Sequence, residues 1–308
     1  MKSITIATFI SNMETFNFDF LYLIDFLKEK SLNVETIVFC DNFIPNLDLS
    51  FKQIVTSGMT KYLRIKKLIE VSTNNFIFCI DNDMIIQKEN FYKFIMDCKN
   101  NNALSWGRIK TIHKNNFISY LIDIDKIISH NFIRPFLWKN NIGISLPGQI
   151  FMINKKYYIN KLYDTDTVYD DLFLGVITKK NSFPIFFTKE ILGYENPKDN
   201  LVSLIKQRKR WAKGYAETIK YNKNTSELKY IIIHGLMYHI LPIVWIIVLW
   251  LLFFKNPIIA TVLLLSISFI LIDKEISKLV WSICYLLIFP YIHIIWLFFF
   301  IKNLIDID

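Results

Sequence analysis

The stretch Asn75–Asp83, NFIFCIDND, decides the fold of this 308-residue chain. Its first part is continuously apolar, as expected of a strand buried on both faces of a parallel sheet. It ends in Asp81 and Asp83, and ligands of open parallel sheets bind beyond the carboxyl ends of the strands. The stretch therefore predicts a sheet with acidic side chains at the edge where chemistry takes place.

The segments before this stretch alternate between strand and helix patterns. Ser3–Phe9 and Glu35–Cys40 have the composition of strands, and the periodicity of Phe18–Lys30 and Thr60–Val71 predicts helices. Alternation of this kind is typical of an α/β fold with a mostly parallel sheet. Asp41 follows the second of these strands directly, so we expect its side chain at the same edge of the sheet.

The C-terminal part of the chain has the composition of a membrane domain. The segments Tyr230–Phe254 and Leu279–Ile301 contain no formally charged side chain, and each exceeds the roughly 20 residues that a helix needs to cross a bilayer. Asn256–Ile272 is apolar but shorter. We expect a head at residues 1–228 and a membrane domain of two to three spans, three being favoured, at residues 229–308.

Composition and charge narrow the class of protein further. Hydrophobic residues make up 53% of the chain and the net charge is +9. A basic head suits an anionic lipid surface or a diphosphate pocket. The scattered basic residues and the absence of a recognised motif argue against nucleic-acid binding. Four widely spaced cysteines fit a reducing cytosol, and Lys274 and Lys278 favour a cytosolic head by the positive-inside tendency.

Two pairs of acids are candidates for chemistry. Asp81 and Asp83 could share a divalent cation with phosphate oxygens, because Mg²⁺ uses one or two carboxylates plus substrate phosphates. The same residues also suit a simple turn. Asp170 and Asp171, in TVYDDLFLGVI, precede a helical pattern. Such acids either favour the helix dipole or supply a general base.

A basic aromatic cluster, Gln207–Trp211, lies in the amphipathic stretch LVSLIKQRKRWAKGYAETIK that leads to the membrane segments. One interpretation is a basic helix that lies on lipid headgroups. The other is a binding element, in which an arginine fork contacts a diphosphate and the Trp211 ring packs on a sugar.

In this order, the motifs resemble those of the membrane-bound family 2 glycosyltransferases, which include hyaluronan, chitin and cellulose synthases and related lipid glycosyltransferases. The resemblance implies a GT-A nucleotide-sugar-binding fold followed by transmembrane helices. It assigns the catalytic base to Asp171 and metal ligation to Asp83 and Asp81. The residues that it assigns to substrate binding are Thr8, Asp41, Asp81, Asp170, Gln207, Arg210 and Trp211.

Two positions depart from the family pattern, since Tyr169 precedes an Asp-Asp rather than a Glu-Asp pair, and Asn42 replaces a usual second acid. Pro147–Gln149 matches either the small-residue segment that lets backbone approach the acceptor or an ordinary turn. Glu195–Pro197 looks like the segment that usually precedes the Gln-x-x-Arg-Trp motif.

The resemblance implies an inverting transfer from a nucleoside-diphosphate sugar, with UDP as the family-level nucleotide and Mg²⁺ or Mn²⁺ as cofactor. The acceptor is either a growing saccharide or a membrane lipid, at the cell membrane with the catalytic head in the cytosol. An oligomer would supply further walls for a polymer path.

Two hypotheses from other classes remain open. One is an inactive membrane scaffold of the same fold. The other is a transporter, for which the imidazoles of His234, His239 and His293 would mark the substrate path, although we expect them to pack against neighbouring side chains. Residues 105–145 are predicted to form an interfacial helix or an acceptor-side loop.

Overall fold

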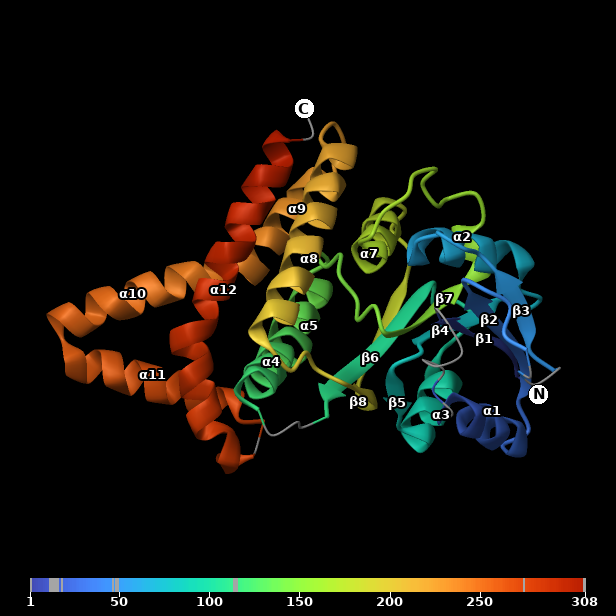
Figure 1. Ribbon diagram of the computed structural model, residues 1–308, viewed down its shortest axis with the longest axis horizontal. Helices are drawn as coiled ribbons and strands as arrows, with labels where there is room; N and C mark the ends of the chain where they lie inside the picture. Colours follow the sequence, from blue (N-terminus) through green and yellow to red (C-terminus); the bar gives the residue numbers. More distant parts are fainter. Residues whose placement is uncertain are drawn as a thin grey trace. The chain divides into compact units, whose positions relative to one another are not determined.

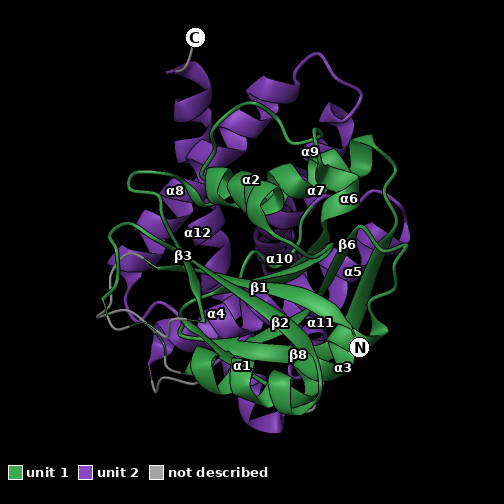
Figure 2. Cartoon of the chain, turned by 90° about the vertical axis from the view of Figure 1, so that its right-hand side faces the viewer, with its two compact units in different colours: residues 1–110, 145–196 green, residues 111–144, 197–308 purple. Residues whose placement is uncertain are grey.

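The computed structural model of the chain describes residues 2–10, 17, 19–45, 47, 50–112, 116–273 and 275–306. The chain divides into two compact units, which Figure 2 colours separately. Unit 1 comprises residues 1–110 and 145–196, and unit 2 comprises residues 111–144 and 197–308. Phe18 and Lys274, which take part in the predictions above, lie outside the described residues.

Unit 1 is built on an eight-stranded sheet with the strand order β3-β2-β1-β4-β7-β6-β8-β5. Its strands are β1 Ser3–Ile10, β2 Asn33–Cys40, β3 Lys52–Val55, β4 Phe76–Asp81, β5 Met84–Ile86, β6 Leu104–Thr111, β7 Ile150–Asn154 and β8 Ile185–Glu195. Its helices are α1 Asp19–Glu29, α2 Lys61–Val71, α3 Lys88–Asp97, α6 Lys155–Tyr158 and α7 Asp170–Lys180. The predicted early strands and helices are therefore confirmed within a residue or two at their ends, as far as the chain is described.

The sheet is mixed, so the prediction of a mostly parallel sheet is correct for its first half alone. β1 pairs in parallel with β2 and β4, and β2 with β3, whereas β7 pairs antiparallel with both β4 and β6, and β5 with β8. Every residue of β7 is buried. A strand that is buried along its whole length is usual in parallel sheets, but burial on both faces does not encode strand direction.

Helices cover both faces of this sheet, α1 and α3 on one and α2 and α7 on the other (Figure 1). On the α3 face, Phe78 of β4 packs edge-on against Phe91 and Phe94, with ring centroids 5.6 and 5.9 Å apart. On the other face, Tyr62 of α2 meets Phe173 of α7 at 5.7 Å. The first contacts hold α3 against β4, and the second holds the starts of α2 and α7 together.

Unit 2 is helical. Its elements are α4 Phe117–Ile127, the π-helical turn η2 Ile128–Ile133, α5 Arg134–Lys139, α8 Leu201–Asn222, α9 Leu228–Gly235, the π-helical turn η3 Leu236–Ile240, α10 Leu241–Lys255, α11 Pro257–Leu271, the 3₁₀ turn η4 Ile276–Lys278 and α12 Leu279–Ile305. The prediction of an interfacial helix or an acceptor-side loop at residues 105–145 is therefore met by the helices at 117–139 but is wrong for residues 105–111, which belong to strand β6. In Figure 1, α10 and α11 form a hairpin joined at Asn256.

Two helical segments in the described part of the chain are long and apolar enough to cross a membrane. They are Leu228–Lys255 and Ile276–Ile305, with mean hydropathies of 2.3 and 2.2. The third predicted span corresponds to α11, which has 15 residues and is shorter than the roughly 20 that a perpendicular crossing needs. Two of the three favoured spans therefore have the required length.

Candidate active site

Asp81 stands at the centre of an acidic cluster in unit 1, at the carboxyl end of β4. Its carboxylate accepts a hydrogen bond from Lys61 Nζ at 2.5 Å, and its backbone N–H donates to the carbonyl of Gln149 at 2.8 Å. Lys61 Nζ also donates to the carbonyl of Gly148 at 2.6 Å and lies 3.7 Å from Asp170 Oδ2. One lysine therefore joins β4, α7 and the segment before β7.

The position of Lys61 is fixed by its place in the sequence. It is the first residue of α2, and the Thr60 side chain caps that helix by accepting from Leu63 N–H. The ammonium lies 5.5 and 5.7 Å from the ring centroids of Phe9 and Phe151, within the range of cation–π attraction. These contacts hold a positive charge beside the acids.

The pKa values of Asp81 and Lys61 reflect the burial of both side chains and the charges around them. Burial raises the pKa of Asp81 to about 6, against the opposing influence of the Lys61 charge. Burial also disfavours the Lys61 ammonium, but the carboxylates of Asp81 and Asp170 outweigh that effect, so that its pKa lies above the usual value. Lys61 is therefore a permanent cation at neutral pH.

Asp171, the predicted base, lies in the first turn of α7 next to Asp170. Its Oδ1 accepts a hydrogen bond from the N–H of Leu172 at 2.8 Å. Gly148 lies against it, since a Cβ added at Gly148 would stand 3.3 Å from both Cβ and Oδ2 of Asp171. The predicted small-residue segment Pro147–Gln149 thus brings backbone close to the candidate base.

Asp41 and Thr8 occupy the ends of the neighbouring strands. Arg64, one helical turn after Lys61, forms an ion pair with Asp41 and donates to the carbonyl of Thr56 at 3.3 Å. The Thr8 hydroxyl is buried in β1 and has no hydrogen-bond partner among the described residues. The two side chains therefore belong to the same strand-end region of unit 1 as Asp81.

The acids fit a magnesium or manganese ion that shares its ligands with a substrate. Among the described residues, no three His, Cys, Asp or Glu side chains stand close enough together to hold a metal by themselves. Asp83 is exposed two residues after Asp81, and both supply the oxygen ligands that hard cations prefer. A cation there would need phosphate or water oxygens to complete its shell, and it would share Asp81 with Lys61.

The Gln-x-x-Arg-Trp residues lie in α8 of unit 2. Arg210 is exposed, while Gln207 and Trp211 are partly buried. The buried arginine of this run is Arg208, which donates to Asp125 Oδ2 at 2.8 Å and stacks its guanidinium carbon 4.4 Å from the Trp211 ring centroid. Arg208 is not among the residues that the sequence motif assigns to substrate binding.

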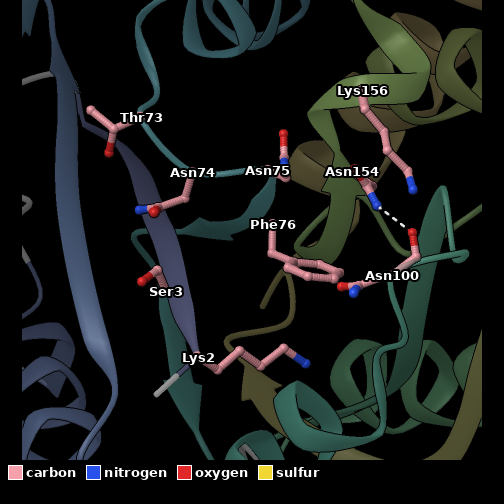
Figure 3. Close-up of a pocket in the computed structure, with 9 residues that line it drawn as sticks. All are labelled: Lys2, Ser3, Thr73, Asn74, Asn75, Phe76, Asn100, Asn154 and Lys156. Carbon is pink, nitrogen blue, oxygen red and sulfur yellow. Dashed lines mark hydrogen bonds between the residues drawn. The ribbon is translucent and has the colours of Figure 1, made fainter.

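A polar hollow of about 490 Å³ lies at the opposite edge of the unit 1 sheet (Figure 3). It is lined at the starts of β1 and β4, by Lys2 and Phe76 among others, and at the end of β7 by Asn154. The Lys2 ammonium lies 4.8 Å from the Phe76 ring centroid and donates to the Cys98 carbonyl at 2.7 Å. None of the predicted site residues borders this hollow.

The mixed sheet with helices on both of its faces is similar to the GT-A fold of a solved glycosyltransferase. The mannosyltransferase PcManGT from Pyrobaculum calidifontis, in complex with GDP-Man and Mn²⁺, superposes with a TM-score of 0.54 and 12% identity, over 99% of this chain and 88% of that one. Mannosyl-3-phosphoglycerate synthase from Rubrobacter xylanophilus follows with a TM-score of 0.48 and 10% identity, over 74% and 77%.

TarS from S. aureus, in complex with UDP-GlcNAc, gives a TM-score of 0.44 and 14% identity, over 78% of this chain and 72% of that one. No protein-family model matches the sequence, and neither does any curated protein sequence. At 12% identity, the likeness to PcManGT shows the GT-A fold alone.

Two basic residues of the site, Lys61 and Arg64, were missed by sequence reasoning. For Lys61, one feature of the sequence indicates its role in the site. A cation in the first turn of a helix opposes the helix dipole, so Lys61 directly after the cap Thr60 indicates a second role for that side chain. No comparable signal marks Arg64 within KYLRIKKL.

Proposed function

We propose that the chain is a glycosyltransferase that moves a sugar from a nucleoside-diphosphate sugar to an acceptor hydroxyl at a membrane. The observation that carries the proposal is the pairing of Lys61 with Asp81 and Asp170 at the carboxyl end of β4, with Asp171 next to Asp170 and against Gly148. Ligands of α/β sheets bind at this edge, and the GT-A fold supports the choice of substrate class. UDP is the nucleotide that the sequence motifs favour.

The proposed reaction inverts the configuration of the anomeric carbon. Asp171 takes the proton of the acceptor hydroxyl, whose oxygen forms a bond to the anomeric carbon from the face opposite the leaving group. The bond from that carbon to the diphosphate oxygen breaks, and the nucleoside diphosphate leaves with the electron pair. Lys61 stabilises the growing negative charge from a fixed position, which is the preorganised help that usually contributes most.

Asp83 and Asp81 would hold the divalent cation. When bound, such an ion neutralises the diphosphate of the leaving group. Asp41, oriented by Arg64, and Thr8 are proposed to bind the nucleoside side of the donor. Their position at the ends of adjacent parallel strands supports this role.

Unit 2 is proposed to supply the acceptor side of the reaction at the membrane surface, with residues 229–308 as the membrane domain. Its two long apolar segments support a multi-pass protein, and the proposed orientation places the head in the cytosol. Arg210, exposed on α8, is proposed to contact the diphosphate with Gln207, and Trp211 to stack on an acceptor sugar.

Two acceptor classes fit this scheme, a growing saccharide and a membrane lipid. Polysaccharide synthesis follows from the motif resemblance. One observation favours the lipid, namely an apolar cavity of about 480 Å³ within unit 2.

The decisive experiment measures nucleoside-diphosphate release from a panel of nucleotide sugars by the full chain in membranes, with and without Mn²⁺. We expect turnover of one donor by the wild type, and loss of transfer with retained donor binding in Asp171→Asn. Wild-type turnover by Asp171→Asn would contradict the base assignment. Failure of every donor would favour the inactive scaffold.

A further inference from the structure

An apolar cavity of about 480 Å³ lies within unit 2, among η2, η3, α10, α11 and α12. Its volume is in the range of small-molecule sites, about 300–1,000 Å³. Representative side chains of its walls are Phe132, Trp245, Val248, Ile267 and Leu286. Figure 1 shows α10 and α11 as a hairpin beside α12, and all three helices contribute residues to the wall.

The polar side chains that line the cavity are paired with one another. Tyr285 donates its hydroxyl to Asp125 Oδ1 at 2.9 Å, and Ser129 donates to the hydroxyl of Tyr238 at 3.4 Å. The other oxygen of Asp125 accepts from Arg208. An occupant of this cavity would therefore gain contact with hydrocarbon and little new hydrogen bonding.

This lining decides between a carbohydrate and a hydrocarbon occupant. Transfer of a sugar hydroxyl out of water without a new hydrogen-bond partner costs free energy. The polar groups of the cavity are already paired and offer such a hydroxyl few partners. An alkyl or isoprenoid chain gains free energy with every buried methylene. The surrounding helices α10 and α12 belong to the two segments that are long enough to cross a membrane, so lipid chains are the medium in which this cavity opens.

One wall residue of the cavity, Asp125, is hydrogen-bonded to the motif segment of α8. Asp125 lines the cavity and holds Arg208, and Arg208 stacks on Trp211. The Arg208 side chain is 6% exposed, so this connection is part of the interior of unit 2. A chain in the cavity would thus contact Asp125, whose partner Arg208 stacks on the Trp211 ring that the proposed function assigns to the acceptor sugar.

We infer that this cavity holds the hydrocarbon chain of a lipid-linked acceptor, and that the acceptor is therefore a lipid rather than a free polysaccharide. The inference rests on the proposed function for the reaction itself. The cavity recognises the hydrocarbon chain of this acceptor, and the headgroup of the acceptor carries the reacting hydroxyl.

The test uses the full chain in phosphatidylcholine nanodiscs and a dodecyl glucoside whose chain carries a photoreactive diazirine. After irradiation, mass spectrometry locates and quantifies the label. We expect labelled peptides from α10, α11 or α12, competed by unlabelled dodecyl glucoside. Substitution of Val248 or Ile267 by Trp should lower labelling at least about tenfold, the change expected when two methylene groups lose their burial.

Ile247→Trp is the matched control, because Ile247 is the neighbour of Val248 on α10, is exposed, and does not line the cavity. It should label like the wild type. Equal labelling of Val248→Trp, Ile267→Trp and Ile247→Trp would overturn the inference. A diazirine on the phosphatidylcholine chain that labels the same peptides as strongly, and is not competed by dodecyl glucoside, would overturn the acceptor assignment by showing bilayer lipid in the cavity.

The labelling readout is independent of donor turnover. Hydrolysis of the nucleotide sugar, in which water takes the place of the acceptor hydroxyl and the nucleoside diphosphate leaves, is measured in the same nanodiscs and reports on the proposed function. It should be unchanged in Val248→Trp. Cavity labelling with no donor consumed would contradict the proposed function, whereas donor consumption with no cavity labelling would contradict the lipid inference.

Discussion

Lys61→Met is the sharpest perturbation of the candidate site, because it removes one ammonium and leaves the shape of the side chain nearly intact. Lys61 donates to Asp81 at 2.5 Å and to the Gly148 carbonyl at 2.6 Å. Hydrogen bonds to charged groups contribute roughly 1.5–3 kcal/mol each. The side chains of Lys61 and Asp81 are 22% and 30% exposed, so solvent replaces part of that energy and we expect a loss of about 3 kcal/mol in total.

The measurement is thermal unfolding of the full chain in detergent with EDTA, for which this loss corresponds to a lower Tm by roughly 6–12 °C. Lys66→Met is the matched control, since Lys66 lies on the same helix and pairs at 2.8 Å with Asp164, whose side chain is fully exposed. Exposed pairs contribute little, so this variant should melt like the wild type. Equal melting of the two variants would refute the claim that Lys61 neutralises a partly buried acid.

The pH dependence of this effect has a definite sign. Burial raises the folded-state pKa of Asp81 to about 6, above the usual value of about 4. Ionised Asp81 therefore opposes folding, and its contribution to stability falls as the pH rises from about 4 to about 6. Removal of Lys61 raises that pKa further. The Tm difference between Lys61→Met and the wild type should thus be larger at about pH 8 than at about pH 5.

Three further substitutions test the proposed roles one by one. Asp83→Ala should abolish the gain in donor affinity that Mn²⁺ provides, and calorimetry that finds this gain intact would exclude Asp83 as a ligand. Trp211→Ala should raise the acceptor KM more than the donor Kd, and an effect on the donor alone would contradict sugar stacking. Gly148→Ala places a Cβ 3.3 Å from Asp171 Oδ2, so kcat should fall about tenfold or more through displacement of the base while calorimetry finds unchanged donor binding.

The carboxylate cluster of unit 1 could be predicted because local rules determine it. An apolar strand at Phe76–Ile80 followed by Asp81 follows from burial and from the rule that loops after parallel strands carry chemistry. The helix that begins at Asp170 follows from acids before an apolar run. These features depend on neighbouring residues in the sequence, and the structure brings both acids to Lys61.

The partners of the acids could not be predicted, because tertiary packing selects them. The chain has 36 lysines and arginines, and most patterns that contain one suit a solvated surface. Lys61 and Arg64 are three residues apart and so lie on one face of α2. Which face meets the strand ends depends on the contact of Tyr62 with Phe173 of α7, a contact between segments distant in the sequence.

The burial of Arg208 determines how the Gln-x-x-Arg-Trp residues are oriented on α8. Gln207, Arg210 and Trp211 occupy positions i, i+3 and i+4, which share one face of an α-helix. Arg208 begins the adjacent face, where it is buried against Asp125. A buried charge pair is costly to desolvate and strongly destabilising when one partner is removed, so this pair fixes the rotation of α8 about its axis. The Arg208–Asp125 pair thereby orients Gln207, Arg210 and Trp211 from the interior of unit 2. This accounts for the buried arginine of the basic run being Arg208, while the motif arginine, Arg210, is exposed.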